Sequence, residues 1–216
     1  MTYLVAFLGN PGKQYEKTRH NVARRLLDPV ERYWMPGWQQ KFHGRFAQVT
    51  VGGGGGEGSR GGSARASGAA SGPASAPAAG PAGEPASAIL LVPETYMNRS
   101  GESVQPCAKY FRIPDARIIV VHDDTEMDFG LIGMKFGGGL GGNNGLKSVA
   151  ERLGTRDFYR LRIGVSRPRH GSLSSHVLGK FAPEEESALP GVIDQAFELL
   201  ETALRQGPAV AGHIVP

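Results

Sequence analysis

The chain has 216 residues, 40% of them hydrophobic, which is enough for one well-buried core and short for two. Its 24 Lys and Arg residues stand against 20 Asp and Glu residues, and this small excess favours a polyanionic partner only weakly. The single cysteine, Cys107, excludes an internal disulfide, and no apolar run approaches the ~20 residues that a membrane span requires.

The first predicted element is a buried strand over Tyr3–Leu8. The N-terminus lacks the basic region that opens a signal peptide, so we expect a cytoplasmic protein. A helix is expected after Asn21, with Leu26 on its apolar face and Pro29 disturbing its end.

A low-complexity segment follows at about 52–87, where the chain contains only Gly, Ala, Ser, Pro and a few charged residues. Such a segment cannot bury enough apolar surface to offset its ordering entropy, so we expect a disordered loop. Strand-like runs flank it at Arg45–Val51 and Ala88–Val92, and their pairing would make the segment the tip of a hairpin. A linker between two domains is the alternative, but the residues before it are too few for an independent core. We therefore predict a single domain over residues 1–216, interrupted by this insertion.

The second half of the chain alternates between helical and strand-like patterns. The predicted elements are, in order, a helix capped by Ser100 and reaching Phe111, a strand over Arg117–Val121, a helix over Asn144–Leu153, a strand over Arg160–Val165 and a helix beginning near Pro183. This alternation predicts an α/β fold: a three-layer sandwich with a sheet flanked by helices. The hairpin makes the twisted sheet mixed rather than purely parallel.

Four polar clusters fall at or just beyond the carboxyl ends of the predicted strands, the edge at which open α/β sheets bind ligands. They are Gly9–Asn21, Thr95–Gly101, His122–Asp124 and Lys135–Gly145. In the first cluster, His20 stands where a loop enters a helix, and a structural role is the commoner one for such a histidine taken alone. In the third, two carboxylates that leave a buried strand need a partner, and one that faces a histidine would hold its tautomer. A solvated turn is the alternative.

The fourth cluster contains G-x-G-x-x-G, but its place late in the chain does not fit a dinucleotide fingerprint. No acidic residue follows at the required distance either, so we predict no nucleotide cofactor. Glycines at this density bring backbone amides close to an extended polar ligand, and Lys135 suits a phosphate. The histidines show no metal-ligand spacing, and the chain has no G-x-S-x-G nucleophile elbow, so we expect no metal and no serine nucleophile.

Taken together and in this order, the clusters resemble the bacterial peptidyl-tRNA hydrolase family. The matching blocks are Leu8–Gly12 with Tyr15, Thr18–Asn21, Thr95–Asn98 with Ser100–Gly101, His122–Asp124, the glycine stretch through Ser148, Arg160–Gly164 and Val177–Phe181. The resemblance covers nearly the whole chain apart from residues 52–87 and the C-terminal end.

The resemblance implies hydrolysis of the ester between a peptide and tRNA by a monomer that needs no metal or cofactor. By similarity, His20 would activate water and Asp123 would orient it. The resemblance also implies that Asn10, Asn98 and Asn144 hold the peptide main chain and the tRNA acceptor end, with Asn10 or Asn98 near the oxyanion. Tyr15 and Met97 would line the cleft wall. Lys135 and Arg162 would bind the tRNA 5′ phosphate.

The sequence departs from the family pattern at a few positions. Leu140 and Asn143 stand where the family usually has histidines, and Ala23 replaces a usual glycine. The alternative is therefore an inactive family member that binds RNA or a protein partner. An intact pair of His20 and Asp123 favours the enzyme, whereas an exposed apolar patch favours a binding protein.

Overall fold

A mixed sheet of eight strands runs through the computed structural model, which describes residues 1–52, 86–168, 170–211 and 213–214. The strands are β1 (Thr2–Phe7), β2 (Gln39–Lys41), β3 (Gly44–Val51), β4 (Ala86–Pro93), β5 (Ile118–Asp124), β6 (Ile132–Phe136), β7 (Tyr159–Gly164) and β8 (His213–Ile214). Their order across the sheet is β2-β3-β4-β1-β5-β7-β6-β8. The central strands β4, β1, β5 and β7 are parallel, and antiparallel pairs extend the sheet on both sides.

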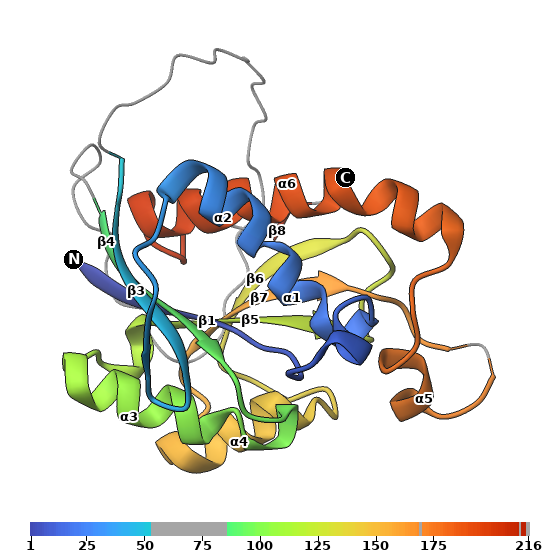
Figure 1. Cartoon of the computed structure of the whole chain (residues 1–216), viewed down its shortest axis with the longest axis horizontal. Coiled ribbons are helices and arrows are strands. Elements are labelled where there is room, and N and C mark those ends of the chain that lie inside the picture. Colours follow the sequence, from blue (N-terminus) through green and yellow to red (C-terminus); the bar gives the residue numbers. More distant parts are fainter. Residues whose placement is uncertain (53–85, 169, 212, 215–216) are drawn as a thin grey trace.

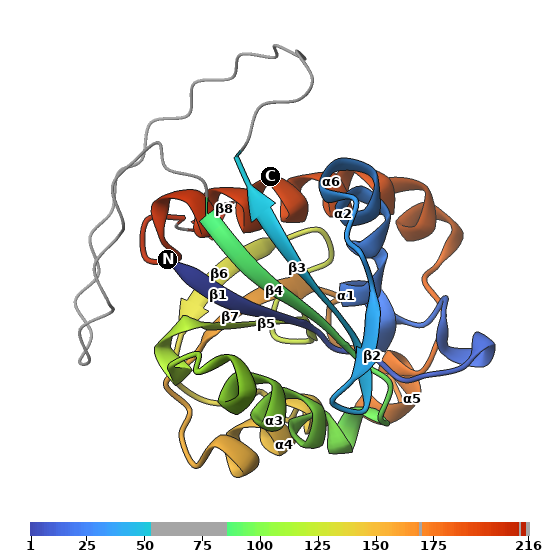
Figure 2. The same ribbon diagram turned by 60° about the vertical axis from the view of Figure 1, so that its left-hand side comes forward.

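Helices cover both faces of this sheet, as the sequence predicted (Figures 1 and 2). The α-helices are α1 (Val22–Arg25), α2 (Leu27–Trp34), α3 (Gly101–Phe111), α4 (Asn144–Leu153), α5 (Leu173–Val177) and α6 (Pro183–Gln206). Four short 3₁₀ helices are η1 (Lys13–Tyr15), η2 (Arg19–Asn21), η3 (Met97–Arg99) and η4 (Asp115–Arg117). Among the described residues, no helix combines the length and apolarity that crossing a membrane demands.

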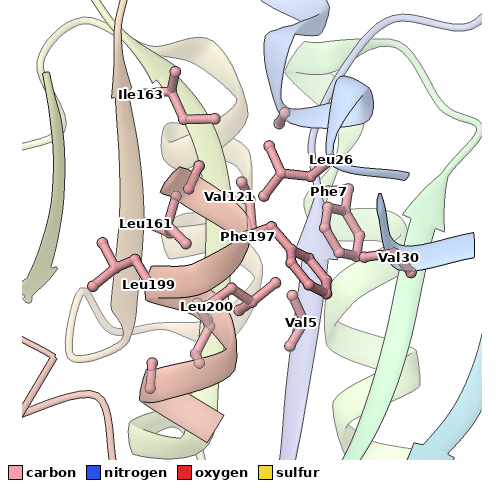
Figure 3. Packing of buried hydrophobic residues seen from close by; sticks show 14 of the residues in the cluster. Val5, Phe7, Leu26, Val30, Val121, Leu161, Ile163, Phe197, Leu199 and Leu200 are labelled. Carbon is pink, nitrogen blue, oxygen red and sulfur yellow. The ribbon is translucent and has the colours of Figure 1, made fainter. Parts of the chain in front are cut away.

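Two hydrophobic cores lie on opposite faces of the sheet, because successive side chains of a strand point to opposite sides. In β1, Val5 and Phe7 belong to the core under α1, α2 and α6, whereas Leu4 and Ala6 belong to the core under α3 and α4. Figure 3 shows Phe197 of α6 directed toward Phe7 and Val5. A strand buried on both faces is the rigid support on which a site at its carboxyl end can be held.

The strands that flank the low-complexity segment pair as the predicted antiparallel hairpin, from Gly44 opposite Pro93 to Val51 opposite Ala86. The predicted C-terminal limit of the insertion is wrong, because β4 begins at Ala86 and Ser87 pairs with both β3 and β1. Backbone pairing on two sides outweighs the low strand propensity of these small residues. The rest of the predicted insertion, 53–85, lies outside the described residues.

One expectation about a helix end agrees with the structure and one is wrong. The helix after Asn21 ends at Arg25, the residue whose carbonyl a Pro29 N–H would have bonded, and Pro29 itself lies in the first turn of α2, where the N–H groups have no partner within the helix. Ser100 precedes α3 as predicted, but its hydroxyl donates to the Met97 carbonyl oxygen at 2.8 Å. The N–H of Gly101 is satisfied instead by the Ser148 hydroxyl of α4, at 3.0 Å.

Other elements agree with the prediction or extend it. Helix α4 has the predicted bounds, α6 begins at Pro183, and Cys107 is fully buried, with its thiol pKa raised to about 12 by burial. Strand β5 is longer than expected and continues through Asp124, because β7 pairs with it to that residue. Strands β2, β6 and β8 and helix α5 were not predicted.

Candidate active site

A cavity of about 450 Å³ opens beyond the carboxyl ends of the parallel strands β1, β4 and β5. Its wall is formed by Asn10, His20, Tyr96–Asn98, His122–Thr125, Leu140–Asn144, Leu173, Ser174, Val177 and Leu178. Helix α5, at the lower right of Figure 1, closes one side of it. The first three predicted clusters therefore meet at one place, since parallel strands bring their carboxyl ends to the same edge of the sheet. Part of the fourth cluster joins them through the loop after β6, a strand that runs antiparallel to β7.

His20 and Asp123 face one another in the wall of this cavity. The Nδ1 atom of His20 lies 2.9 Å from both Asp123 carboxylate oxygens, and the two residues are 8% and 2% exposed. An ionised carboxylate offers only acceptors, so the proton of the neutral imidazole is on Nδ1. The other ring nitrogen, Nε2, is then an acceptor that can take a proton from water.

Asn10 is fixed by three hydrogen bonds just beyond β1. Its backbone N–H donates to Asn21 Oδ1 at 2.8 Å, and Asn21 Nδ2 donates to the Asn10 carbonyl at 2.9 Å. The Asn10 side-chain oxygen accepts from the Met97 backbone N–H at 2.9 Å. The Nδ2 group has no hydrogen-bond partner among the described residues, so it remains a donor for a group in the cavity.

The predicted substrate-binding residues differ in their exposure. Asn98 and Asn144 line the cavity with exposed side chains, whereas Met97 is buried in its wall. Tyr15 is not part of the lining. Its ring packs edge-on against Tyr96, with 6.4 Å between the centroids, and Tyr96 forms part of the wall. Tyr15 therefore supports the cavity wall by packing against Tyr96.

Known proteins match this chain over nearly its whole length. A family model described as peptidyl-tRNA hydrolase matches residues 4–60 and 65–213. The chain belongs to the peptidyl-tRNA hydrolase family. A peptidyl-tRNA hydrolase of Gloeobacter violaceus is 39% identical over 203 residues, covering 93% of this chain and 86% of the relative. One from a Mycobacterium species is 38% identical over 214 residues, covering 98% of this chain and 95% of the relative.

The fold agrees with that of a solved family member. The crystal structure of peptidyl-tRNA hydrolase from Acinetobacter baumannii is 32% identical to this chain and superposes with a TM-score of 0.75. The match covers 96% of this chain and 90% of that one. The family's three-layer α/β architecture is thus also that of this chain.

The predicted phosphate contacts, Lys135 and Arg162, lie outside the cavity lining, on β6 and β7. Arg162 Nε donates to Asp124 Oδ2 at 2.7 Å. Lys135 is exposed and stands opposite Arg160 in the register of the two strands. Arg160 is 3% exposed, and among the described residues its Nη1 alone finds a partner, the Gly139 carbonyl at 2.5 Å. The glycine-rich loop therefore lies against two basic side chains, of which Arg160 had no predicted role.

Two cavity residues that contact Asp123 also had no predicted role. His122 Nδ1 donates to the Asp123 carbonyl at 2.7 Å, and burial lowers the pKa of His122, which keeps its ring neutral. Asn143 Nδ2 donates to Asp123 Oδ1 at 3.1 Å. The sequence does carry a signal for Asn143, because an asparagine directly before a helix is a preferred N-cap.

Arg24 connects the loop after β1 to the end of β4, and this role was also missed. Its guanidinium donates to the carbonyl oxygens of Gly9 at 2.7 Å and Pro93 at 2.5 Å. Burial lowers the pKa of Arg24 to about 10, so the group stays charged at neutral pH.

Among the described residues, no three His, Cys, Asp or Glu side chains gather in a metal-binding arrangement.

Proposed function

We propose that His20 and Asp123 carry out the hydrolysis that defines this family, cleaving the ester between a peptide or an N-blocked aminoacyl group and tRNA. As a family member, the chain is a peptidyl-tRNA hydrolase, a carboxylic ester hydrolase of translation. The observation that carries the residue assignment is the buried His20–Asp123 contact in the cavity wall. It favours the enzyme over the alternative of an inactive RNA- or protein-binding family member.

The proposed reaction uses water as the nucleophile. His20 Nε2 accepts a proton from water while the water oxygen attacks the ester carbonyl carbon. The Asp123 carboxylate compensates the positive charge that develops on the imidazole. The carbonyl oxygen becomes an oxyanion, to which Asn10 Nδ2 donates a hydrogen bond, with Asn98 available beside it. Collapse of this intermediate breaks the bond to the tRNA 3′ oxygen, which takes the proton from His20.

The proposed substrate contacts are to groups that every peptidyl-tRNA shares. The exposed amides of Asn98 and Asn144 can donate to and accept from the peptide main chain and the tRNA acceptor end. Lys135 and Arg162 would hold the 5′ phosphate, and the buried positive charge of Arg160 next to Lys135 would add to the electrostatic attraction there. Such a site accepts many peptide sequences.

On this mechanism the chain works as a monomer in the cytoplasm, where its substrate arises, and without a metal or cofactor. An ester is already activated, so a positioned base, which typically contributes about 10²–10⁴-fold, together with oriented amides can suffice.

The test is cleavage of N-acetyl-aminoacyl-tRNA, with free-amine aminoacyl-tRNA in parallel and a chelator present. We expect rapid loss of the blocked substrate only, and a loss of at least about 10²-fold in kcat for His20→Ala, with tRNA binding retained. Cleavage that survives in His20→Ala would refute the assignment of the base. Binding of tRNA without any cleavage by the unsubstituted chain would favour the inactive binding protein.

A further inference from the structure

We propose that Asn143 is a positioning residue that fixes the carboxylate of Asp123, and through it the ring of His20, to the start of helix α4. This inference rests on the proposed function of the same site. It concerns a position at which this chain departs from the family's usual histidine.

Asn143 uses both ends of its side-chain amide. Its Oδ1 accepts from the backbone N–H groups of Gly145 at 2.9 Å and Leu146 at 3.1 Å, which caps α4. Its Nδ2 donates to Asp123 Oδ1 at 3.1 Å and more weakly to the Asp123 carbonyl at 3.3 Å. The orientation of the amide is determined by its partners, since the opposite one would set oxygen against two acceptors and NH₂ against two donors.

The amide joins the carboxylate to a rigid element. Leu146 and Val149 of α4 are buried in the core, and Gly145 is so close to Met97 that a Cβ there would lie 2.4 Å from the Met97 sulfur. The start of α4 therefore has little freedom to move. A donor anchored there restrains rotation of the Asp123 carboxylate, which is the group that holds the imidazole Nδ1–H.

The second donor also compensates burial of the charge. Asp123 is 2% exposed, and a buried carboxylate requires hydrogen bonds in place of water. His20 supplies one, and Asn143 supplies the other to the same Oδ1 atom. Few side chains at position 143 could supply both a capping oxygen and this N–H. Serine keeps the capping oxygen but is too short to reach Asp123.

A double-mutant cycle tests this role. We expect Asn143→Ser to lower kcat about tenfold, the usual effect of losing a hydrogen bond to a charged group, with KM unchanged and the protein still folded at the assay temperature. In an Asp123→Ala background, measured in single turnovers with excess enzyme, the same substitution should change the rate less than about twofold, because its target is gone. An equal loss in both backgrounds, or a change in KM alone, would overturn the proposal.

A readout that does not need activity separates this inference from the proposed function. In ¹⁵N-histidine-labelled protein, Asn143→Ser should shift the His20 Nδ1–H resonance and leave the signal of His176, a histidine outside the pair, in place. Unchanged His20 signals would refute the positioning role even if the enzyme is active. Conversely, a shift in a protein that cleaves nothing would retain the role and refute the proposed chemistry.

Discussion

Asp123 and Asp124 are neighbours in β5, yet the alternation of the strand gives their side chains different surroundings. Asp123 faces His20, whereas Asp124 accepts from Arg162 at 2.7 Å and from the Glu126 backbone N–H at 2.8 Å. Burial is the largest single influence on Asp124 and opposes its ionisation, but these donors and the positive charge of Arg162 together hold its pKa below the usual value. Asp124 is thus a structural carboxylate that holds the Nε side of Arg162, and the terminal nitrogens of Arg162 remain for the proposed contact with phosphate.

The lowered pKa of Asp124 predicts a pH dependence of stability. A carboxyl group whose pKa is lower in the folded state stabilises the protein above its unfolded pKa of about 3.9, and this contribution is lost as the pH falls through the folded value. We expect Asp124→Asn to lower the thermal midpoint at pH 5–7, and the difference from the unsubstituted chain to shrink below about pH 4. Thermal unfolding between pH 3 and 7 would measure it. The exposed Asp157→Asn serves as control, and a difference that stays constant with pH would contradict the prediction.

The residues of the site were predictable to the extent that the topology alone brings them together. His20 and Asn98 follow two parallel strands of the mixed sheet and Asp123 lies near the end of a third, so their meeting at one edge could be expected from the sequence. The partner of Arg162 could not, because it depends on the register between β5 and β7, which places Arg162 opposite His122 and within reach of Asp124. The hydrogen bond from Asn143 to the Asp123 carboxylate could not be predicted either, because it depends on how far the Asn143 amide extends from the start of α4.

At the scale of elements, the close packing of α3 on α4 supports the cavity wall. Gly101, the first residue of α3, lies so close to α4 that a Cβ would stand 2.1 Å from the Ser148 carbonyl oxygen. Because both groups are backbone or near-backbone, the contact cannot relax by a rotamer change. Gly101 therefore sets the distance between α3 and α4, the helix that is capped by Asn143 and begins at Asn144.

Replacing two helical glycines by alanine is predicted to change the free energy of unfolding in opposite directions. Gly101→Ala should lower the free energy of unfolding by about 1–3 kcal/mol, because the added methyl group overpacks the contact between α3 and α4. Gly191→Ala in α6, where a Cβ meets none of the described residues within 4 Å, should raise it by about 0.5–1 kcal/mol through helix propensity. Urea unfolding of both variants measures these effects. A stable Gly101→Ala protein would show that α4 can move away from α3.

The elements with clear periodicity were predicted, and those that depend on tertiary pairing were not. Helix α4 and the start of α6 carry capping and charge signals in the sequence, and β3 and β4 carry apolar runs. Strand β6 has a glycine and a lysine among its five residues and is defined by its pairing with β7. Helix α5 has five residues, too few for a periodic pattern.

At the scale of the whole molecule, the residues that flank the insertion and the active site lie at opposite ends of the sheet. Strand β4 runs parallel to β1, with Ser87 beside Thr2 and Leu91 beside Ala6, so the residues that join the insertion lie at the amino ends of these strands. The cavity lies beyond their carboxyl ends. Figure 2 shows this separation, with the N-terminus beside the start of β4 and α5 at the far end.

This separation predicts that the insertion can be removed without loss of activity. Replacing residues 52–85 by Asn-Gly gives β3 and β4 a two-residue turn and should raise the free energy of unfolding by about 2 kcal/mol, through the lower cost of closing the loop. Values of kcat and KM for N-acetyl-aminoacyl-tRNA should stay within about twofold, since no cavity residue changes. A chain with a Gly-Ser repeat of the original length is the control, and it should match the full chain in both stability and activity. A tenfold rise in KM for both variants would instead mean that the insertion's own sequence takes part in binding tRNA.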